Sequence, residues 1–159
     1  MTESNSIDTI DIRAVRPDDE AASSMIRALD EYQLALYPAE SNHLDDLETL
    51  LQPNVYFVGA YRHSELIGIG AVKTVADYGE IKRVYVAQNA RGSGAAKALM
   101  AALEAHLRQL GISEARLETG TRQPEALQLY HSLGYERTGP FGDYQEDPLS
   151  VFMYKDLNR

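Results

Sequence analysis

Apolar and polar residues alternate with two different periods along this chain, and each period predicts one kind of element. Ile10, Ile12 and Ala14 alternate with polar residues, which predicts a half-buried strand that Pro17 ends. Acidic residues follow the proline, where the first turn of a helix favours negative charge, and apolar residues then recur at helical spacing. We expect a long helix that reaches Tyr37.

The middle of the chain predicts a short helix followed by several strands. Leucines from Leu44 to Leu51 recur at helical spacing, with Ser41 or Asn42 as the expected cap and Pro53 at the end. Apolar, β-branched runs separated by short polar segments then predict strands joined by hairpin loops. We expect these strands at residues 55–61, 66–75 and 80–86.

After Gly92 the period becomes helical and then alternates once more. The apolar stripe from Ala95 to Leu110 predicts a helix that Gly111 ends. We also expect a strand at 115–119, a helix at 124–133 and a last strand at 151–154. The segment 135–150 is rich in Gly, Pro and Asp, so we expect loop packing there rather than much sheet.

Strands and helices in this order predict an α/β fold (α+β mixed sheet) with helices on both faces. At least one parallel crossover should join the strand at Glu80 to the strand at Ala115. Ligands in such sheets usually lie at the carboxyl ends of the parallel strands. We see no repeat or linker in the 159 residues, so we expect one domain over 1–159, with 1–8 as a flexible tail.

Composition excludes several classes of function. The chain contains no cysteine, which excludes disulfides, thiolate metal sites and cysteine nucleophiles. Its four histidines lack the spacing of metal ligands, so we expect no metal. The formal net charge of −9 argues against nucleic acid as a partner. It mildly favours a cationic substrate, although solubility alone would explain it equally well.

The sequence predicts a cytoplasmic protein that has no membrane partner. The first residues are polar and acidic, unlike a signal peptide, and no apolar run approaches the length of a membrane span. The lack of cysteine fits a reducing compartment.

A loop with two glycines, between the strand that ends at Val86 and the next helix, predicts an anion site. Small residues let a ligand approach the backbone, and the amides and dipole of a helix start suit a pyrophosphate. A tight turn without a ligand is the alternative. The P-loop motif is absent, and Lys97 stands where a dinucleotide site needs a third glycine after Gly92 and Gly94, which disfavours a nucleotide-binding enzyme.

The same loop resembles the acyl-CoA signature of the GNAT superfamily of N-acetyltransferases. That signature is Arg or Gln, two residues, Gly, one residue, and Gly or Ala, which here corresponds to Arg91, Gly94 and Ala96. A second family motif follows in the expected order on the helix after the next strand. It comprises Gln123, where Asn is commoner, then Ala126, Leu129-Tyr130 and Gly134-Tyr135. The resemblance covers nearly the whole chain and implies the GNAT-like acyl-CoA N-acyltransferase fold.

The resemblance implies acetyl-CoA as co-substrate. The strand backbone at 84–86 would bind the pantetheine arm and the acyl carbonyl, and the loop and helix start would bind the pyrophosphate. The cofactor-binding residues implied in this way are Val84, Tyr85, Val86, Arg91, Gly92, Ser93, Gly94, Ala95, Ala96, Lys97 and Gln123.

Two residues are candidates for proton transfer. The resemblance implies that Tyr130 protonates the departing CoA thiolate, and a phenol with a pKa near ~10 remains protonated at neutral pH. A packing role is the alternative for Tyr130. Glu80 matches a strand position that carries the general base in some family members. Its alternative role is an ion pair with Lys82, Arg83 or another cation.

The function implied is transfer of an acetyl group from acetyl-CoA to a primary amine, by direct attack in a ternary complex. Tyr37, His43 and Tyr144 are candidates for lining the amine pocket, and the acidic, aromatic segment 141–150 either closes over a cationic acceptor or forms a plain loop. The acceptor, a small molecule or a protein amine, stays open. So does the oligomeric state, although dimers are common in the family. A non-catalytic acyl-CoA-binding regulatory module is the alternative function.

Overall fold

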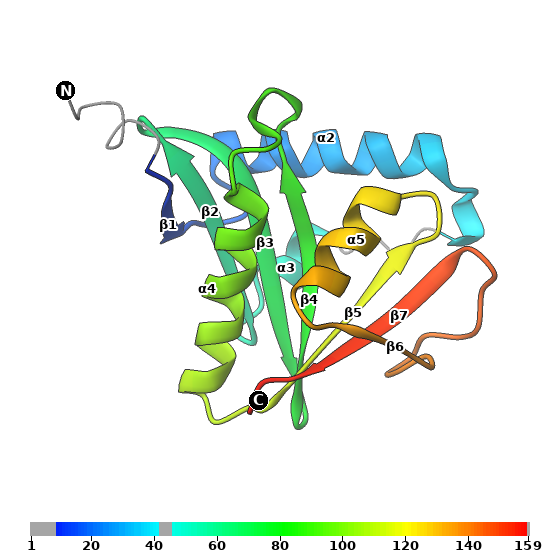
Figure 1. Cartoon of the computed structure of the whole chain (residues 1–159). Helices are drawn as coiled ribbons and strands as arrows, with labels where there is room; N and C mark the ends of the chain where they lie inside the picture. Colours follow the sequence, from blue (N-terminus) through cyan, green and yellow to red (C-terminus); the bar gives the residue numbers. More distant parts are fainter. Residues whose placement is uncertain (1–8, 42–45, 159) are drawn as a thin grey trace.

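The computed structural model describes residues 9–41 and 46–158, and Figure 1 shows its elements along the chain. The strands are β1 (Asp11–Ala14), β2 (Val55–Arg62), β3 (Glu65–Val75), β4 (Tyr78–Val86), β5 (Glu114–Gly120), β6 (Glu136–Thr138) and β7 (Ser150–Asp156). The helices are α2 (Glu20–Leu36), η1 (Ala39–Ser41), α3 (Leu47–Leu50), η2 (Gln88–Ala90), α4 (Ala95–Gln109) and α5 (Pro124–Ser132).

All seven strands form one mixed sheet, in the order β1-β2-β3-β4-β5-β7-β6. The pair β4–β5 is parallel and every other pair is antiparallel. The helix α4 makes the crossover between the two parallel strands, as Figure 1 shows. The prediction of a mixed sheet with a parallel crossover at this place is confirmed.

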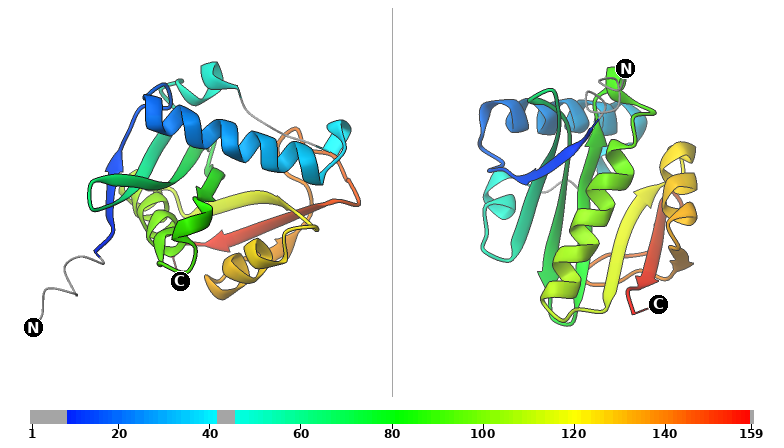
Figure 2. Two further views of the ribbon diagram at one scale, coloured as in Figure 1. Left: turned by 90° about the horizontal axis from the view of Figure 1, so that it is seen from above. Right: turned by 60° about the vertical axis from the view of Figure 1, so that its left-hand side comes forward.

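Helices cover both faces of the sheet, as the views in Figure 2 show. On one face, α4 buries Leu99, Leu103 and Leu107 in a large apolar cluster against which α5 also packs. On the other face, Ala22 of α2 and Leu50 of α3 pack in a second cluster with inward residues of β2 and β3. The apolar spacing of each helix therefore produces one buried stripe.

The strands β4 and β5 pair over a short distance and then separate. Their register runs from Gly79 opposite Ala115 to Ile81 opposite Leu117. Just beyond this point β4 carries a bulge, because Ile69 pairs with Tyr85 while Ala71 pairs with Lys82. Arg83 lies in the bulge with φ of 59°, in the left-handed region. The separation and the bulge open the sheet at its centre.

The predicted cap of the short helix was wrong. The helix α3 starts at Leu47, and its cap is Asp46, whose Oδ1 accepts from Thr49 N at 2.9 Å. Ser41 instead ends η1, and Asn42 lies outside the described residues. The segment 135–150, where loop packing rather than much sheet was expected, contains the three-residue strand β6, whose residues are all exposed and pair with β7. Such a strand has no buried side and therefore no alternating pattern.

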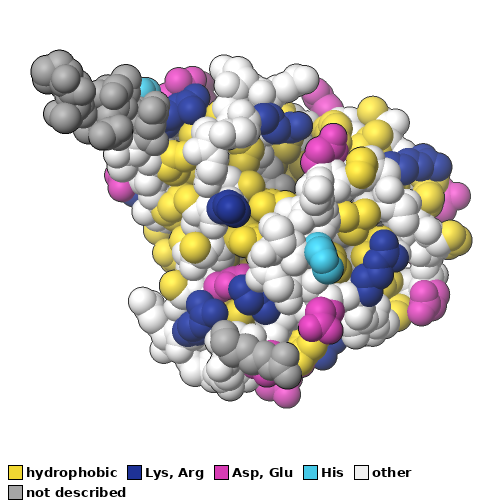
Figure 3. All heavy atoms as spheres, in the orientation of Figure 1, with side chains coloured by type: hydrophobic (Ala, Val, Ile, Leu, Met, Phe, Trp, Pro, Cys, Tyr) yellow, Lys and Arg dark blue, Asp and Glu magenta, His cyan; other side chains and the backbone are white. Residues whose placement is uncertain are grey.

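Three further observations concern the start of the chain, the helices and the surface charge. The tail expected at residues 1–8 lies outside the described residues. Among the residues that the structure describes, no helix has the length and apolar character needed to cross a membrane. On the α4–α5 face in Figure 3, Lys and Arg side chains are interspersed with Asp and Glu.

Candidate active site

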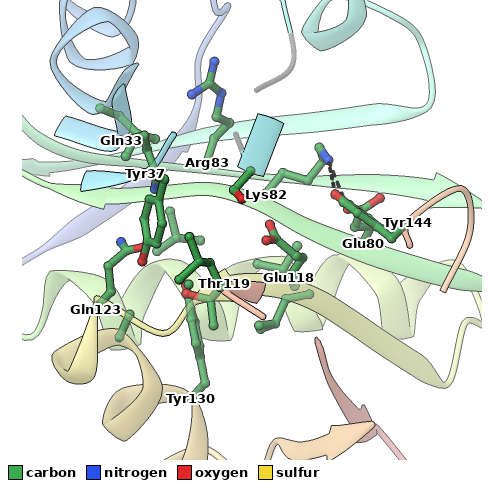
Figure 4. A pocket seen from close by; sticks show the side chains of 18 residues that line it. Gln33, Tyr37, Glu80, Lys82, Arg83, Glu118, Thr119, Gln123, Tyr130 and Tyr144 are labelled. Carbon is green, nitrogen blue, oxygen red and sulfur yellow. Dashed lines mark hydrogen bonds and ion pairs between the residues drawn. The ribbon is translucent and has the colours of Figure 1, made fainter. Parts of the chain in front are cut away.

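A cavity lies where β4 and β5 separate, and Figure 4 shows its wall. Its volume is about 110 Å³, and it is lined by residues of α2, β4, β5, α5 and the segment before β7. A second cavity of about 850 Å³ adjoins it. The two cavities share Ser41, Glu80, Lys82, Tyr144 and Leu149. A reacting group in the first cavity can therefore be approached from the second.

Glu80 is buried in the shared wall and holds two donors on one carboxylate oxygen. Its Oε2 accepts from Tyr144 Oη at 2.6 Å and from Lys82 Nζ at 3.0 Å. Glu80 and Lys82 point the same way because they are two residues apart on β4. The structure thus forms one of the ion pairs that the sequence analysis gave as the alternative role for Glu80. Arg83 is paired with Asp30 of α2 instead.

Glu118 lines the first cavity from β5 and was not among the site residues predicted from the sequence. Its Oε2 accepts from Ser150 Oγ of β7 at 2.9 Å. Burial raises the pKa of this carboxyl to about 7, against the opposing effects of the Ser150 hydrogen bond and the charge of Lys82. A carboxyl with such a pKa exchanges protons readily near neutral pH. A glutamate near the carboxyl end of a parallel strand was the available signal.

Tyr130 reaches the same cavity from α5 and is only 8% exposed. Burial raises the pKa of its hydroxyl to about 12, and the nearby charge of Glu118 adds to this effect. Its ring packs edge-on against Tyr135, with 6.1 Å between the ring centroids. The hydroxyl therefore stays protonated at neutral pH and can act as a proton donor.

The structure also places two other candidate residues side by side. Tyr37 Oη donates to Gln123 Oε1 at 3.1 Å and accepts from Arg122 N at 3.0 Å, so α2 is tied to the start of α5. Figure 4 shows this pair on one side of Glu118 and the joined Glu80 and Tyr144 on the other. His43, the third candidate for the amine pocket, lies outside the described residues.

The loop before α4 has the geometry of an anion site. Gly92 and Gly94 have φ of 81° and 89°, and a Cβ at either position would meet no atom within 4 Å, so the space beside both glycines is open. The first helical hydrogen bond, Ala98 N to Gly94 O, leaves the amides of residues 95–97 ahead of it, and Ala95 N donates to Ser93 Oγ. These residues fit a pyrophosphate.

The strand that leads into this loop turns its edge toward the cleft. Because the β4–β5 pairing ends at Ile81 and Leu117, the edge of β4 at residues 84–86 is not paired with β5. Val84 lines the cavity, and Arg91 Nε donates to Val86 O at 3.2 Å, which fixes the loop to the strand end. An extended ligand with amide groups could pair with this edge. Within the described ranges, no group of three or more His, Asp or Glu residues could hold a metal ion.

Comparisons with known proteins show the family to which this chain is similar. The model of the acetyltransferase (GNAT) family matches residues 22–135, which include the loop, Glu80 and Tyr130. The IAA acetyltransferase of Azospirillum brasilense is 43% identical over 143 residues, which are 89% of this chain and 94% of that protein. A solved structure from Klebsiella pneumoniae, named as an acyl-CoA N-acyltransferase, is 36% identical with a TM-score of 0.81. The match covers 94% of this chain and 99% of that one.

One further solved structure shares the fold at lower identity. The PaiA N-acetyltransferase of Thermoplasma acidophilum, solved in complex with coenzyme A, is 20% identical with a TM-score of 0.72. The match covers 93% of this chain and 99% of that one.

Proposed function

This chain belongs to the GNAT family and is an acetyl-CoA-dependent N-acetyltransferase, and from this premise we propose that it acetylates a primary amine by direct attack in a ternary complex. One observation supports the proposal most. The cavity between β4 and β5 has a buried tyrosine hydroxyl, that of Tyr130, and the carboxylates of Glu80 and Glu118 in its wall. It therefore contains a proton donor and proton acceptors around one space.

The chain's own groups suggest how acetyl-CoA is held. The amides of residues 96 and 97, the positive end of the α4 dipole and the exposed cations Arg91 and Lys97 would hold the pyrophosphate. The edge of β4 at residues 84–86 would hold the pantetheine arm, with Gln123 beside it. When bound, acetyl-CoA supplies the activated acyl group and a thiolate leaving group.

Proton transfer is assigned to groups on the cavity wall. Tyr130, with its pKa of about 12, would donate its proton to the leaving thiolate. The acceptor enters as an ammonium ion and must lose a proton before its nitrogen can attack. Glu80, the residue that the family resemblance indicates, and Glu118 are the carboxylates of the cavity that can take this proton.

We propose that the acceptor amine enters through the second cavity. This cavity has the volume of a small-molecule site and shares Glu80, Lys82 and Tyr144 with the first. Its wall also carries Glu40, Asp143, Glu146 and Asp147. We propose as well that residues 1–159 form one domain, since a single sheet runs through the described elements.

An amine panel tests the function. Purified protein is mixed with acetyl-CoA and small amines, amino acids, polyamines or peptide amines, and thiol release is followed with a disulfide dye. We expect release with at least one class of amine, and the acetylated product should appear by mass spectrometry. A thermal shift with acetyl-CoA, combined with no thiol release across the whole panel, would instead support a non-catalytic acyl-CoA-binding module.

A further inference from the structure

We propose that Glu118, rather than Glu80, takes the proton from the acceptor ammonium, and that Glu80 builds the cavity wall with Lys82 and Tyr144. This inference rests on the proposed acetyl transfer to an amine. It starts from the different ways in which the two carboxylates are held in the same cavity.

Glu80 is already engaged by an ammonium group of the protein. The side chains of Lys82 and Glu80 are 10% and 9% exposed, and Lys82 Nζ lies 3.0 Å from Glu80 Oε2. Tyr144 donates to the same oxygen at 2.6 Å. An acceptor ammonium that used this carboxylate would bring a second cation against Lys82 in a site with little water, and like charges in such a site repel strongly. This arrangement suits a structural role for Glu80 in the cavity wall better than a role as the proton acceptor.

Glu118 is held more loosely and faces the reacting space. Within the part of the chain that the structure describes, the hydrogen bond from Ser150 Oγ to its Oε2 is its only side-chain hydrogen bond. Figure 4 shows its carboxylate directed into the cavity. Glu118 follows Leu117, the last β5 residue paired with β4, so its backbone lies where the cleft opens. An acceptor nitrogen in the cavity can reach the other carboxylate oxygen.

Charged and titratable groups from every side of the cavity act on Glu118. Burial and the charges of Glu80 and Asp147 raise its pKa, while Ser150 and Lys82 lower it, with a result of about 7. Tyr130, which lines the same cavity from α5, has a pKa raised to about 12. The charged or titratable residues that line this cavity with Glu118 are Glu80, Lys82 and Arg83 of β4, Tyr130 of α5, Tyr37 at the end of α2, and Tyr144; Ser150 of β7 and Asp147 also act on the Glu118 carboxyl. Two groups with pKa values this far apart suit a base and an acid.

The proton balance of the reaction follows. One N–H bond of the acceptor ammonium breaks, its proton passes to a Glu118 oxygen, and the nitrogen lone pair is released. The nitrogen then bonds to the acyl carbon, the carbon–sulfur bond breaks, and the thiolate takes the proton of the Tyr130 hydroxyl. The amide nitrogen gives up a second proton, which balances the one that Tyr130 donated. Glu118 returns its proton to solvent, so one proton is released in each turnover.

The test is the pH profile of kcat/KM for the parent, Glu118→Gln and Glu80→Gln with an amine that the parent acetylates. The parent should lose activity below a pH of about 7, where Glu118 is protonated. Glu118→Gln should lose roughly 10²-fold or more at neutral pH. This loss should shrink about tenfold per pH unit toward the pKa of the amine, because the free amine then needs no base.

The fall of kcat/KM at low pH is the acidic limb of the profile. If Glu118 is the base, two variants should move this limb in opposite directions. Glu80→Gln removes a charge that raises the pKa of Glu118, so the limb should move to lower pH. Ser150→Ala removes a hydrogen bond that lowers this pKa, so the limb should move to higher pH. If Glu80→Gln abolishes the limb while Glu118→Gln and Ser150→Ala leave it in place, Glu80 is the base and the proposal is overturned.

Two measurements without turnover complete the design. Glu118→Gln should keep the thermal shift that acetyl-CoA gives the parent, which separates loss of a base from loss of fold or cofactor. Carboxyl ¹³C NMR of the protein without acetyl-CoA should show one glutamate that titrates near pH 7 and is absent in Glu118→Gln. If the NMR signal is found but no amine is acetylated, the proposed function fails. If amines are acetylated and the signal is missing, the assignment of Glu118 fails alone.

Discussion

The hydroxyl of Tyr130 combines the two properties that a proton donor in this reaction needs. It lines the cavity at the separation of β4 and β5, and burial raises its pKa to about 12. A hydroxyl with this pKa is fully protonated across the neutral range, and it can give its proton to a sulfur anion formed beside it. Its ring packs edge-on against the ring of Tyr135.

Tyr130→Phe should therefore reduce kcat by roughly 10²–10⁴ while acetyl-CoA binding stays nearly unchanged. The ring remains, so no cavity forms in the core and the unfolding midpoint should stay close to that of the parent. Steady-state kinetics and thermal shifts with acetyl-CoA measure both effects. With an acyl donor whose leaving thiol is more acidic, the defect should shrink, because a better leaving group needs less protonation. An equal defect with both donors would instead indicate a positioning role.

The residues of the site differ in how far the sequence could predict them. Tyr130, Glu80 and Gln123 fall in or beside motifs that resemble a family, and the fold brings all three to one cavity. Glu118 belongs to no such motif. Its raised pKa depends on burial and on Glu80, Asp147, Lys82 and Ser150, which lie on other segments. Such a combination exists only after the strands have assembled.

At the scale of elements, a substitution at the start of α4 tests whether this part of the chain binds acetyl-CoA. Gly94→Glu should abolish the thermal stabilisation by acetyl-CoA, because the carboxylate would fill open space beside the expected pyrophosphate and repel it. For the parent, this stabilisation is about 2.7 kcal/mol at a hundredfold excess of ligand over Kd. Differential scanning fluorimetry with and without acetyl-CoA measures it.

Gly111, at the other end of α4, provides a matched control. It also has a positive φ, 78° against 89° for Gly94, and a Cβ there would likewise meet no atom within 4 Å. Gly111→Glu therefore introduces the same charge and a similar backbone strain on the same helix. It should keep the full acetyl-CoA shift. Equal shifts in the two variants would show that the loop before α4 does not hold the pyrophosphate.

The elements themselves were largely predictable, and the exceptions have physical reasons. Long apolar stripes and alternation are local, and the predicted spans of α2, α4 and β3 lie within a few residues of the structure. The bulge at Arg83 was not predicted, because no sequence pattern marks a positive φ at an arginine. The separation of β4 from β5 was not predicted either, since it depends on pairing between segments that are far apart in the sequence.

At the scale of the whole molecule, a buried carboxylate in the crossover helix α4 joins this helix to the segment after α5 and to the last strand of the chain. Glu104 of α4 accepts from Tyr135 Oη at 2.8 Å and from Lys155 Nζ of β7 at 2.9 Å, and Tyr135 is fully buried. Tyr135→Phe should lower the free energy of unfolding by about 1–3 kcal/mol, because Glu104 stays buried without one of its donors. Urea denaturation measures this.

The double variant Tyr135→Phe with Glu104→Gln separates the hydrogen bond from ring packing. If the bond to the charged carboxylate is responsible, the effects of the two single changes should not add, since each change weakens the same contact. Additive effects would indicate that the Tyr135 hydroxyl contributes through other neighbours. Turnover should change little in Tyr135→Phe, because the ring that packs against Tyr130 remains.

The pH dependence of unfolding gives a test of Glu118 that needs neither acetyl-CoA nor an acceptor. Its pKa is about 7 in the folded protein and 4.5 for an ordinary exposed glutamate, as in the unfolded chain, so the folded state holds the proton more tightly. The stability from this proton is fully present below about pH 4.5 and is lost as the pH rises through 7. The loss is at most on the order of 3 kcal/mol, since solvent partly screens a half-buried group. Glu118→Gln has no proton to lose, so its unfolding free energy relative to the parent should increase between pH 4.5 and pH 8. Urea denaturation of both proteins at each pH measures this difference, and a difference that stays constant with pH would mean that folding does not shift the titration of Glu118.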